Sequence, residues 1–192
     1  MRKLFYFIGL FIVFIAMTSS SLVKYPSVSN TAFEEGERLR YRVTYGFVDA
    51  GEAIIEVKST KHKRDGRALY HVKGTGRTLG GFNSFYKVYD TYESYIDKKS
   101  MMPWIFKRHV NEGGYKIDQR YDFSQNQNKV YNGKEDYTVS MGIQDMISSF
   151  YRARTLNFDG MKKGKIFSFK CFMDNEVFTL KIKYMGKEEV RI

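Results

Sequence analysis

The stretch RLRYRVTYGFVDAGEAIIEVK, residues 38–58, decides the fold. In residues 38–45, arginine or threonine alternates with leucine, valine or tyrosine. A period of two is the pattern of a half-buried β-strand. We predict a turn at Gly46–Gly51, after which residues 52–58 resume the alternation. The whole stretch therefore predicts a β-hairpin.

Similar patterns continue along the chain, and they predict a mainly β domain. Asp65-Gly66 and Asn111–Gly114 are typical hairpin turns. The glycine-rich stretch 74–81 favours a bend or bulge, because it lacks the third spaced glycine, the Lys-Ser/Thr pair and the following helix of a phosphate loop. Further strands are predicted at Leu69–Lys73, Phe85–Ile96, Pro103–Val110, Tyr115–Phe123, around Val130, Ile166–Met173 and Val177–Tyr184.

One segment changes period and predicts a helix. Asp145 is a suitable N-cap. Apolar and basic residues follow it at helical spacing for two to three turns, and this helix is expected to lay one apolar face on the sheet. The positions are Met146, Ile147, Phe150, Tyr151 and Arg154.

The N-terminus has the pattern of a secretory signal peptide. Arg2 and Lys3 precede an apolar run from Leu4 to Met17, and a small, polar stretch follows. Such a run is too short to span a bilayer but suits an export signal. We expect a signal peptide at 1–20, a flexible leader at 21–32 and one β-rich domain at 33–192. An uncleaved signal anchor stays open, because the cleavage region lacks a clean small-x-small pair.

Charge and cysteine content narrow the class of protein. The formal net charge is +11, and the basic residues are spread along the chain. Outside the cytoplasm, the abundant acidic partners are anionic lipids and acidic glycans, so nucleic acid is not expected. Cys171 is the only cysteine, which excludes an internal disulfide and a lipid anchor on a cysteine after the signal. We expect an exported monomer, periplasmic or extracellular, with Cys171 as a semi-buried thiol.

Several motifs follow one another between about Phe33 and Ile192. They are Gly36–Gly46, Asp49–Ala53, Tyr86–Asp90, Pro103-Trp104, Phe106–Arg108, Glu112–Gly114, Ser149–Arg154 and Gly160. As a set they resemble exported bacterial proteins of the domain-of-unknown-function family numbered 3108. The resemblance implies a single curved antiparallel sheet, a half-open barrel, wrapping one short α-helix, similar to lipoprotein carriers. We expect the chain to end before the closing strands of that family, either as a natural short member or as a truncated one.

No motif in the sequence indicates a particular reaction. The three histidines, His62, His71 and His109, have no metal-ligand spacing, so we predict no enzyme, cofactor or metal. Arg108, Asp90, Asp145 and Arg152 are expected to form a polar cluster near the helix, either as buried ion pairs or as a ligand anchor.

The leading functional hypothesis is an envelope protein that binds a lipophilic or anionic acyl ligand in the groove of the half-barrel. One alternative is a structural or assembly protein that pairs through strand edges. Another is a glycan-binding protein that stacks sugars on aromatic rings. Candidate lining residues are Tyr45, Phe82, Phe85, Tyr89, Trp104 and Phe106, and candidate head-group contacts are Arg77, Lys87, Arg108 and Arg152.

Overall fold

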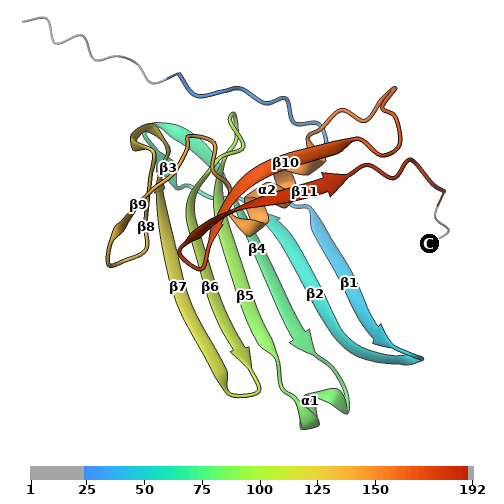
Figure 1. The fold of residues 1–192 in the computed structure, drawn as a ribbon. Helices are drawn as coiled ribbons and strands as arrows, with labels where there is room; N and C mark the ends of the chain where they lie inside the picture. The colour runs from blue at the N-terminus through green and yellow to red at the C-terminus, as the bar shows by residue number, and fades with distance from the viewer. Residues whose placement is uncertain (1–23, 190–192) are drawn as a thin grey trace, which may run out of the picture.

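The computed structural model describes residues 24–189, so the predicted signal peptide lies outside the described residues. The fold is mainly β, with a large antiparallel sheet that stays open and a short helix on one of its faces (Figure 1). In the sheet, neighbouring strands follow the order β1-β2-β4-β5-β6-β7-β8-β9, and β3 pairs with the start of β4. The strands are β1 Arg38–Tyr45, β2 Val48–Lys58, β3 Lys63–Arg64, β4 Arg67–Thr78, β5 Tyr89–Asp97, β6 Pro103–Glu112, β7 Tyr115–Ser124, β8 Lys129–Tyr131 and β9 Asp136–Thr138.

The sheet has two chemically different faces, because side chains alternate along each strand. The inner face carries the main core, which includes Val57, Val72, Phe106 and Tyr121. The outer face carries ion pairs and a smaller apolar cluster of Leu69, Tyr95 and Trp104. The two clusters therefore lie on opposite sides of the same strands.

Helix α2, Met146–Arg154, packs on the inner face together with a separate hairpin of β10, Ile166–Met173, and β11, Glu176–Lys183. Asp145 caps the helix as predicted, since its carboxylate accepts the Ser148 amide at 2.6 Å. Ile147 and Tyr151 face the core, so the helix does lay an apolar face on the sheet, but Met146 and Phe150 of the predicted set are exposed. In Figure 1 these elements cover only the upper half of the sheet, and the lower half of the inner face is bare.

Several predicted strands and turns are confirmed. The Asp65-Gly66 and Gly113-Gly114 turns have positive φ at both residues, as a two-residue type I′ hairpin requires. The β6–β7 and β10–β11 hairpins and the short strand at Val130 are present.

Other boundaries were wrong. The turn after β1 contains only Gly46 and Phe47, because β2 begins at Val48, and Val48, Asp49 and Gly51 already pair with β1. Strand β4 continues through Gly74 and Gly76 without a bulge. The predicted strand start at Phe85 is the end of the one-turn helix α1, Phe82–Phe85, and β5 begins at Tyr89.

Residues 24–32 precede the sheet without forming a strand or helix. The Tyr25 ring lies 5.8 Å from the Trp104 ring, and the Val28 amide donates to the Lys99 carbonyl at 2.7 Å. Phe33 is the first buried side chain of residues 24–189, and the contacts of Tyr25 and Val28 already join the segment before it to the sheet. Among the helices of residues 24–189, none has the length and apolar character needed to cross a membrane.

Candidate functional site

An apolar groove of about 360 Å³ lies on the bare half of the inner face, between β2, β4 and the α1 connection. Its volume and apolar lining fall within the range of small-molecule sites. One wall comes from Phe82 and Phe85 of α1, and Tyr86 follows directly in the chain. The other lining residues are Val43, Ala50, Gly51, Glu52, Ala53, Gly76, Arg77, Thr78 and Val88.

The floor of the groove consists of residues with little or no side chain. Ala53 pairs with Gly76, and Gly51 pairs with Thr78, on neighbouring strands. A Cβ added at Gly51 would lie 2.9 Å from the Arg77 carbonyl oxygen, so close packing of the backbone requires that glycine. A Cβ added at Gly76 would meet nothing within 4 Å. The missing side chain of Gly76 therefore leaves open space in the groove.

A smaller apolar pocket of about 180 Å³ continues from the groove toward α2. It shares Ala53 and Gly76 with the groove and ends against Met146 and Ile147 of the helix. Gly74 and Thr78 are four positions apart in β4, which corresponds to about 13 Å at the usual strand rise. The two hollows together form an apolar strip from the helix to the lower end of the sheet.

Arg77 does not face this strip. It follows Gly76 in β4, so its side chain lies on the outer face, where it forms an ion pair with Glu52. Arg40 of β1 bonds the same carboxylate at 2.6 Å. Glu52 is only 2% exposed, and hydrogen bonds from Arg77 and Arg40 hold its pKa below the usual value. Arg77 thus ties β2 to β4.

The remaining basic candidates do not converge on the groove. The Arg108 guanidinium donates to Gln119 at 2.7 Å and pairs with Asp174 of the β10–β11 turn. Arg152 donates to Thr155, the C-cap of α2, at 2.9 Å, and burial lowers the pKa of Arg152. Lys87 is exposed, immediately after Tyr86 at the groove mouth.

The predicted cluster of Arg108, Asp90, Asp145 and Arg152 is wrong. Each of these groups has other polar partners: Asp145 accepts the Ser94 hydroxyl at 2.6 Å, and Asp90 accepts the Asn111 amide at 2.9 Å. A hydrogen bond with Asp90, together with its charge, raises the pKa of Glu112. This carboxyl pair flanks the groove floor, because Asp90 pairs with Gly76.

The six aromatic candidates separate into three locations. Phe82 and Phe85 line the groove, and the Tyr45 ring lies beside them, 6.4 Å from the Phe82 ring. Tyr89 pairs with Arg77 and lies exposed on the outer face. Phe106 is fully buried in the main core, whereas Trp104 belongs to the outer cluster.

The opposite placement of Trp104 and Phe106 has a local cause. Two residues apart, they would share a face in a regular strand. The register between β5 and β6 shifts between Tyr95 and Ile96, so Trp104 falls at the irregularity. Neither residue lines the groove. Sequence reasoning missed Tyr86, Val88 and Gly76, although the glycines of a strand interior were the available signal.

Groups that could support catalysis are dispersed. His71 bonds Glu93 at 2.6 Å and stacks on Tyr95, while His109 lies 3.1 Å from Asp118. Cys171 is buried, and burial raises the pKa of its thiol. Within residues 24–189, no three His, Cys, Asp or Glu side chains are grouped to hold a metal ion.

Comparison with known proteins gives one match. Neither curated proteins nor solved structures are significantly similar to the chain. Residues 40–192 match the family described as "Protein of unknown function (DUF3108)". The match covers β1 from Arg40 onward and every later element of the fold, so the chain belongs to the DUF3108 family.

Proposed function

We propose that this protein binds a lipophilic ligand, such as an acyl chain, in the groove of the inner face, without catalysing a reaction. The observation that carries the proposal is the floor at Gly76. Glycine inside a strand weakens the strand and usually marks a bulge, a tight bend or the close approach of another molecule. The register of β4 with both neighbouring strands is regular at Gly76, and no protein atom lies within 4 Å of a Cβ built there. Of these three explanations, this favours the approach of another molecule, a ligand.

The walls match the chemistry of such a ligand. Phe82, Phe85 and Tyr86 offer aromatic surface, and the adjoining pocket at Met146 extends the apolar strip. Burial of apolar surface is worth roughly 25 cal/mol per Å², so an acyl chain gains affinity along the whole strip.

A charged head would remain at the mouth. The carboxyl pair of Asp90 and Glu112 disfavours an anion on the β5–β6 side of the floor. Lys87, beside the mouth, is the basic candidate that fits an anionic head group. The other three basic candidates have structural partners on the protein.

We further propose that the protein is exported and acts in the cell envelope. The support is the charged, apolar and small-residue pattern of residues 1–20. An open antiparallel sheet with a helix on one face is also the arrangement we expected for a half-barrel similar to lipoprotein carriers.

The test is a Gly76→Val variant compared with Thr75→Val. Position 76 faces the groove with free space, whereas position 75, next in the strand, faces outward. Binding of a fluorescent fatty acid should fall more than tenfold in Gly76→Val and stay unchanged in Thr75→Val. Urea unfolding should show both variants to be at least as stable as the parent, since β-branched residues suit strands. Undiminished binding by a folded Gly76→Val protein would refute the groove assignment.

A second candidate function is strand pairing with another envelope protein. Within residues 24–189, strand β1 is an eight-residue sheet edge that pairs on one side only. Such an edge is a template for an added strand. Crosslinking from an Arg42→Cys variant in whole envelopes would capture that partner, and a Gly76→Val substitution should not affect the capture.

A further inference from the structure

Three connections of the sheet meet at one end of the molecule. They are the β1–β2 turn at Gly46-Phe47, the β4–β5 connection with α1 and the β6–β7 turn at Gly113-Gly114. Consecutive antiparallel strands place alternate connections at the same end, and Figure 1 shows these three together at the lower end. We call residues 45–48, 82–87 and 113–116 the aromatic tips.

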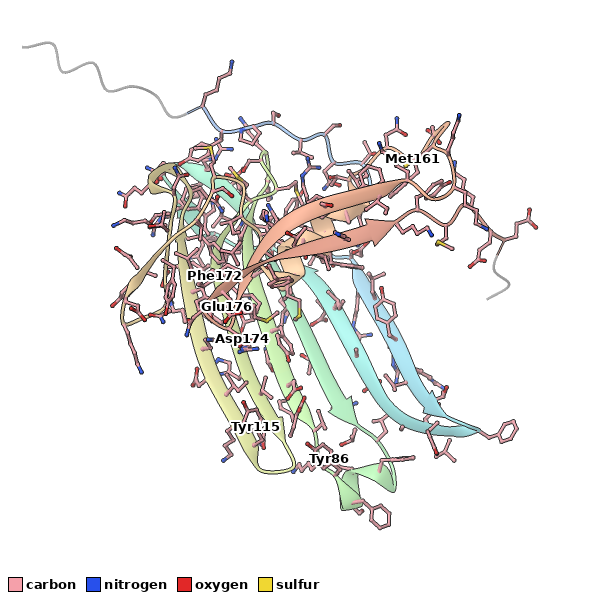
Figure 2. All side chains as sticks on the ribbon, viewed as in Figure 1. Tyr86, Tyr115, Met161, Phe172, Asp174 and Glu176 are labelled. Carbon is pink, nitrogen blue, oxygen red and sulfur yellow. The ribbon has the colours of Figure 1, made fainter. Side chains whose placement is uncertain are left out.

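The aromatic tips expose aromatic rings to solvent. The four most exposed large hydrophobic side chains of the described residues are all here: Phe47 at 108%, Phe85 at 91%, Tyr45 at 77% and Tyr115 at 63%. Tyr86 is also exposed, and Figure 2 labels it and Tyr115 at this end. Single exposed apolar residues are ordinary, but their gathering at one end indicates an interaction surface.

The connections at the opposite end differ in character. The loop before β4 carries Lys61, Lys63 and Arg64, and the β5–β6 connection begins with Lys98 and Lys99. Its methionines, at positions 101 and 102, are buried. Exposed aromatic rings in the connections are thus concentrated at one end of an elongated sheet.

The aromatic tips are spread along a line and held in place. Four strand spacings separate the β1–β2 turn from the β6–β7 turn, which amounts to about 19 Å. The Tyr86 ring lies so close to Gly113 that a Cβ there would clash with it, and the Gly113 amide donates to the Lys87 carbonyl at 2.9 Å. These contacts hold the β4–β5 and β6–β7 tips together. A row of exposed rings of this length suits a broad flat surface better than the compact apolar core of a protein interface.

We propose that the aromatic tips dock on the surface of a lipid bilayer that contains anionic lipids. Aromatic side chains favour the boundary between headgroups and acyl chains. Lys87 and Lys116 neighbour Tyr86 and Tyr115, and neither forms an ion pair with a residue of 24–189. Free basic groups near the surface favour an anionic leaflet.

Docking would also place the groove mouth at the membrane. Phe85 and Tyr86 belong both to the aromatic tips and to the groove wall. An acyl chain would then pass between bilayer and groove without crossing water. This link rests on the proposed function, whereas the docking itself does not.

A probe can be attached at one chosen position, because the single cysteine of the chain, Cys171, is buried. An environment-sensitive fluorophore is attached to full-length Phe85→Cys, Tyr115→Cys or Lys61→Cys, since buried Cys171 stays unlabelled in the folded chain. Vesicles contain phosphatidylcholine and phosphatidylglycerol, with a nitroxide-labelled lipid as quencher. The expected result is a blue shift and several-fold stronger quenching at positions 85 and 115 than at position 61. The apolar N-terminal run is present in all three proteins, so their comparison removes its contribution.

Equal quenching at positions 85 and 61 would overturn the proposal. A blue shift at position 85 that grows with protein concentration without vesicles would also overturn it, by identifying a second copy as the partner. A Gly76→Val substitution should lower fatty-acid binding more than tenfold and leave the quenching unchanged, so failure of the groove and failure of docking are distinguishable.

Discussion

Replacing Asp145 by asparagine should stabilise the protein at neutral pH, although Asp145 is the N-cap of α2. The carboxyl group is completely buried, and burial raises its pKa from 3.8 to about 6 against the hydrogen bonds from Ser148 and Ser94. A folded-state pKa above the unfolded value means that the ionised group opposes folding. The stability associated with the neutral carboxyl is complete below pH 3.8 and is lost as the pH rises through 6.

The size of the effect follows from the shift. About two pKa units correspond to about 3 kcal/mol lost at pH 7. Asparagine keeps the cap, because its carbonyl oxygen can accept the Ser148 amide. The Ser94 hydroxyl loses its acceptor, which costs about 1 kcal/mol. The variant should therefore be about 2 kcal/mol more stable at pH 7, and this gain should vanish near pH 4.

Urea unfolding at pH 4, 5, 6 and 7, followed through the single tryptophan, Trp104, measures this difference. Asp145→Ala is the matched control, because it removes both the charge and the cap and should fall below Asp145→Asn by about 1 kcal/mol at every pH. A difference between Asp145→Asn and the parent that does not change with pH would refute the reasoning.

Four other predictions concern buried or paired side chains. Asp97→Asn should have the opposite effect and destabilise the protein. Burial raises the Asp97 pKa, but hydrogen bonds from Arg67 and two backbone amides outweigh burial and lower that pKa. In urea unfolding, the variant should therefore cost about 3 kcal/mol at pH 7 and less as the pH falls below 4. Phe106→Ala should cost about 4 kcal/mol in the same assay, because the ring is fully buried in the core and does not line the groove. Glu112→Gln should stabilise at pH 7 and have less effect at pH 4, since the neighbouring Asp90 raises the Glu112 pKa; a constant difference would contradict the pairing. Cys171 should react with a thiol reagent at pH 8 only after urea unfolding, and rapid reaction of the folded protein would contradict its burial.

Local patterns predicted those elements whose structure depends on local residues. The alternation in residues 38–45 predicts the bounds of β1, but the expected half-burial is wrong, because only Leu39 is partly buried. The Asp145 cap predicts the start of α2 at Met146. Gly74 and Gly76 misled the prediction because glycine also favours turns, yet here both neighbouring strands pair with β4 across them. Hydrogen bonding to two neighbours outweighs the local preference of glycine.

The candidate site was only partly accessible to sequence reasoning. Phe82 and Phe85 were identified from their aromatic character and do line the groove. Arg77 was assigned to the ligand, but its face follows from the parity of β4, and its partner Glu52 lies 25 residues away. The face of the sheet on which Trp104 lies depends on a register shift that no residue type in the sequence indicates. In both cases, the pairing of residues far apart in the sequence determines where the side chain lies.

The partial cover of the inner face has a consequence for local motion. Strands β2, β4 and β5 run from the half beneath α2 into the bare half, so one strand passes through two environments. Amide hydrogen exchange follows local opening, which needs less free energy where few apolar contacts are buried. We expect the Val72 amide, under the helix, to exchange only on global unfolding. The Gly76 amide, four residues along the same strand, should exchange through a smaller opening, so this half of the sheet can adjust to an incoming molecule while the other half holds the fold.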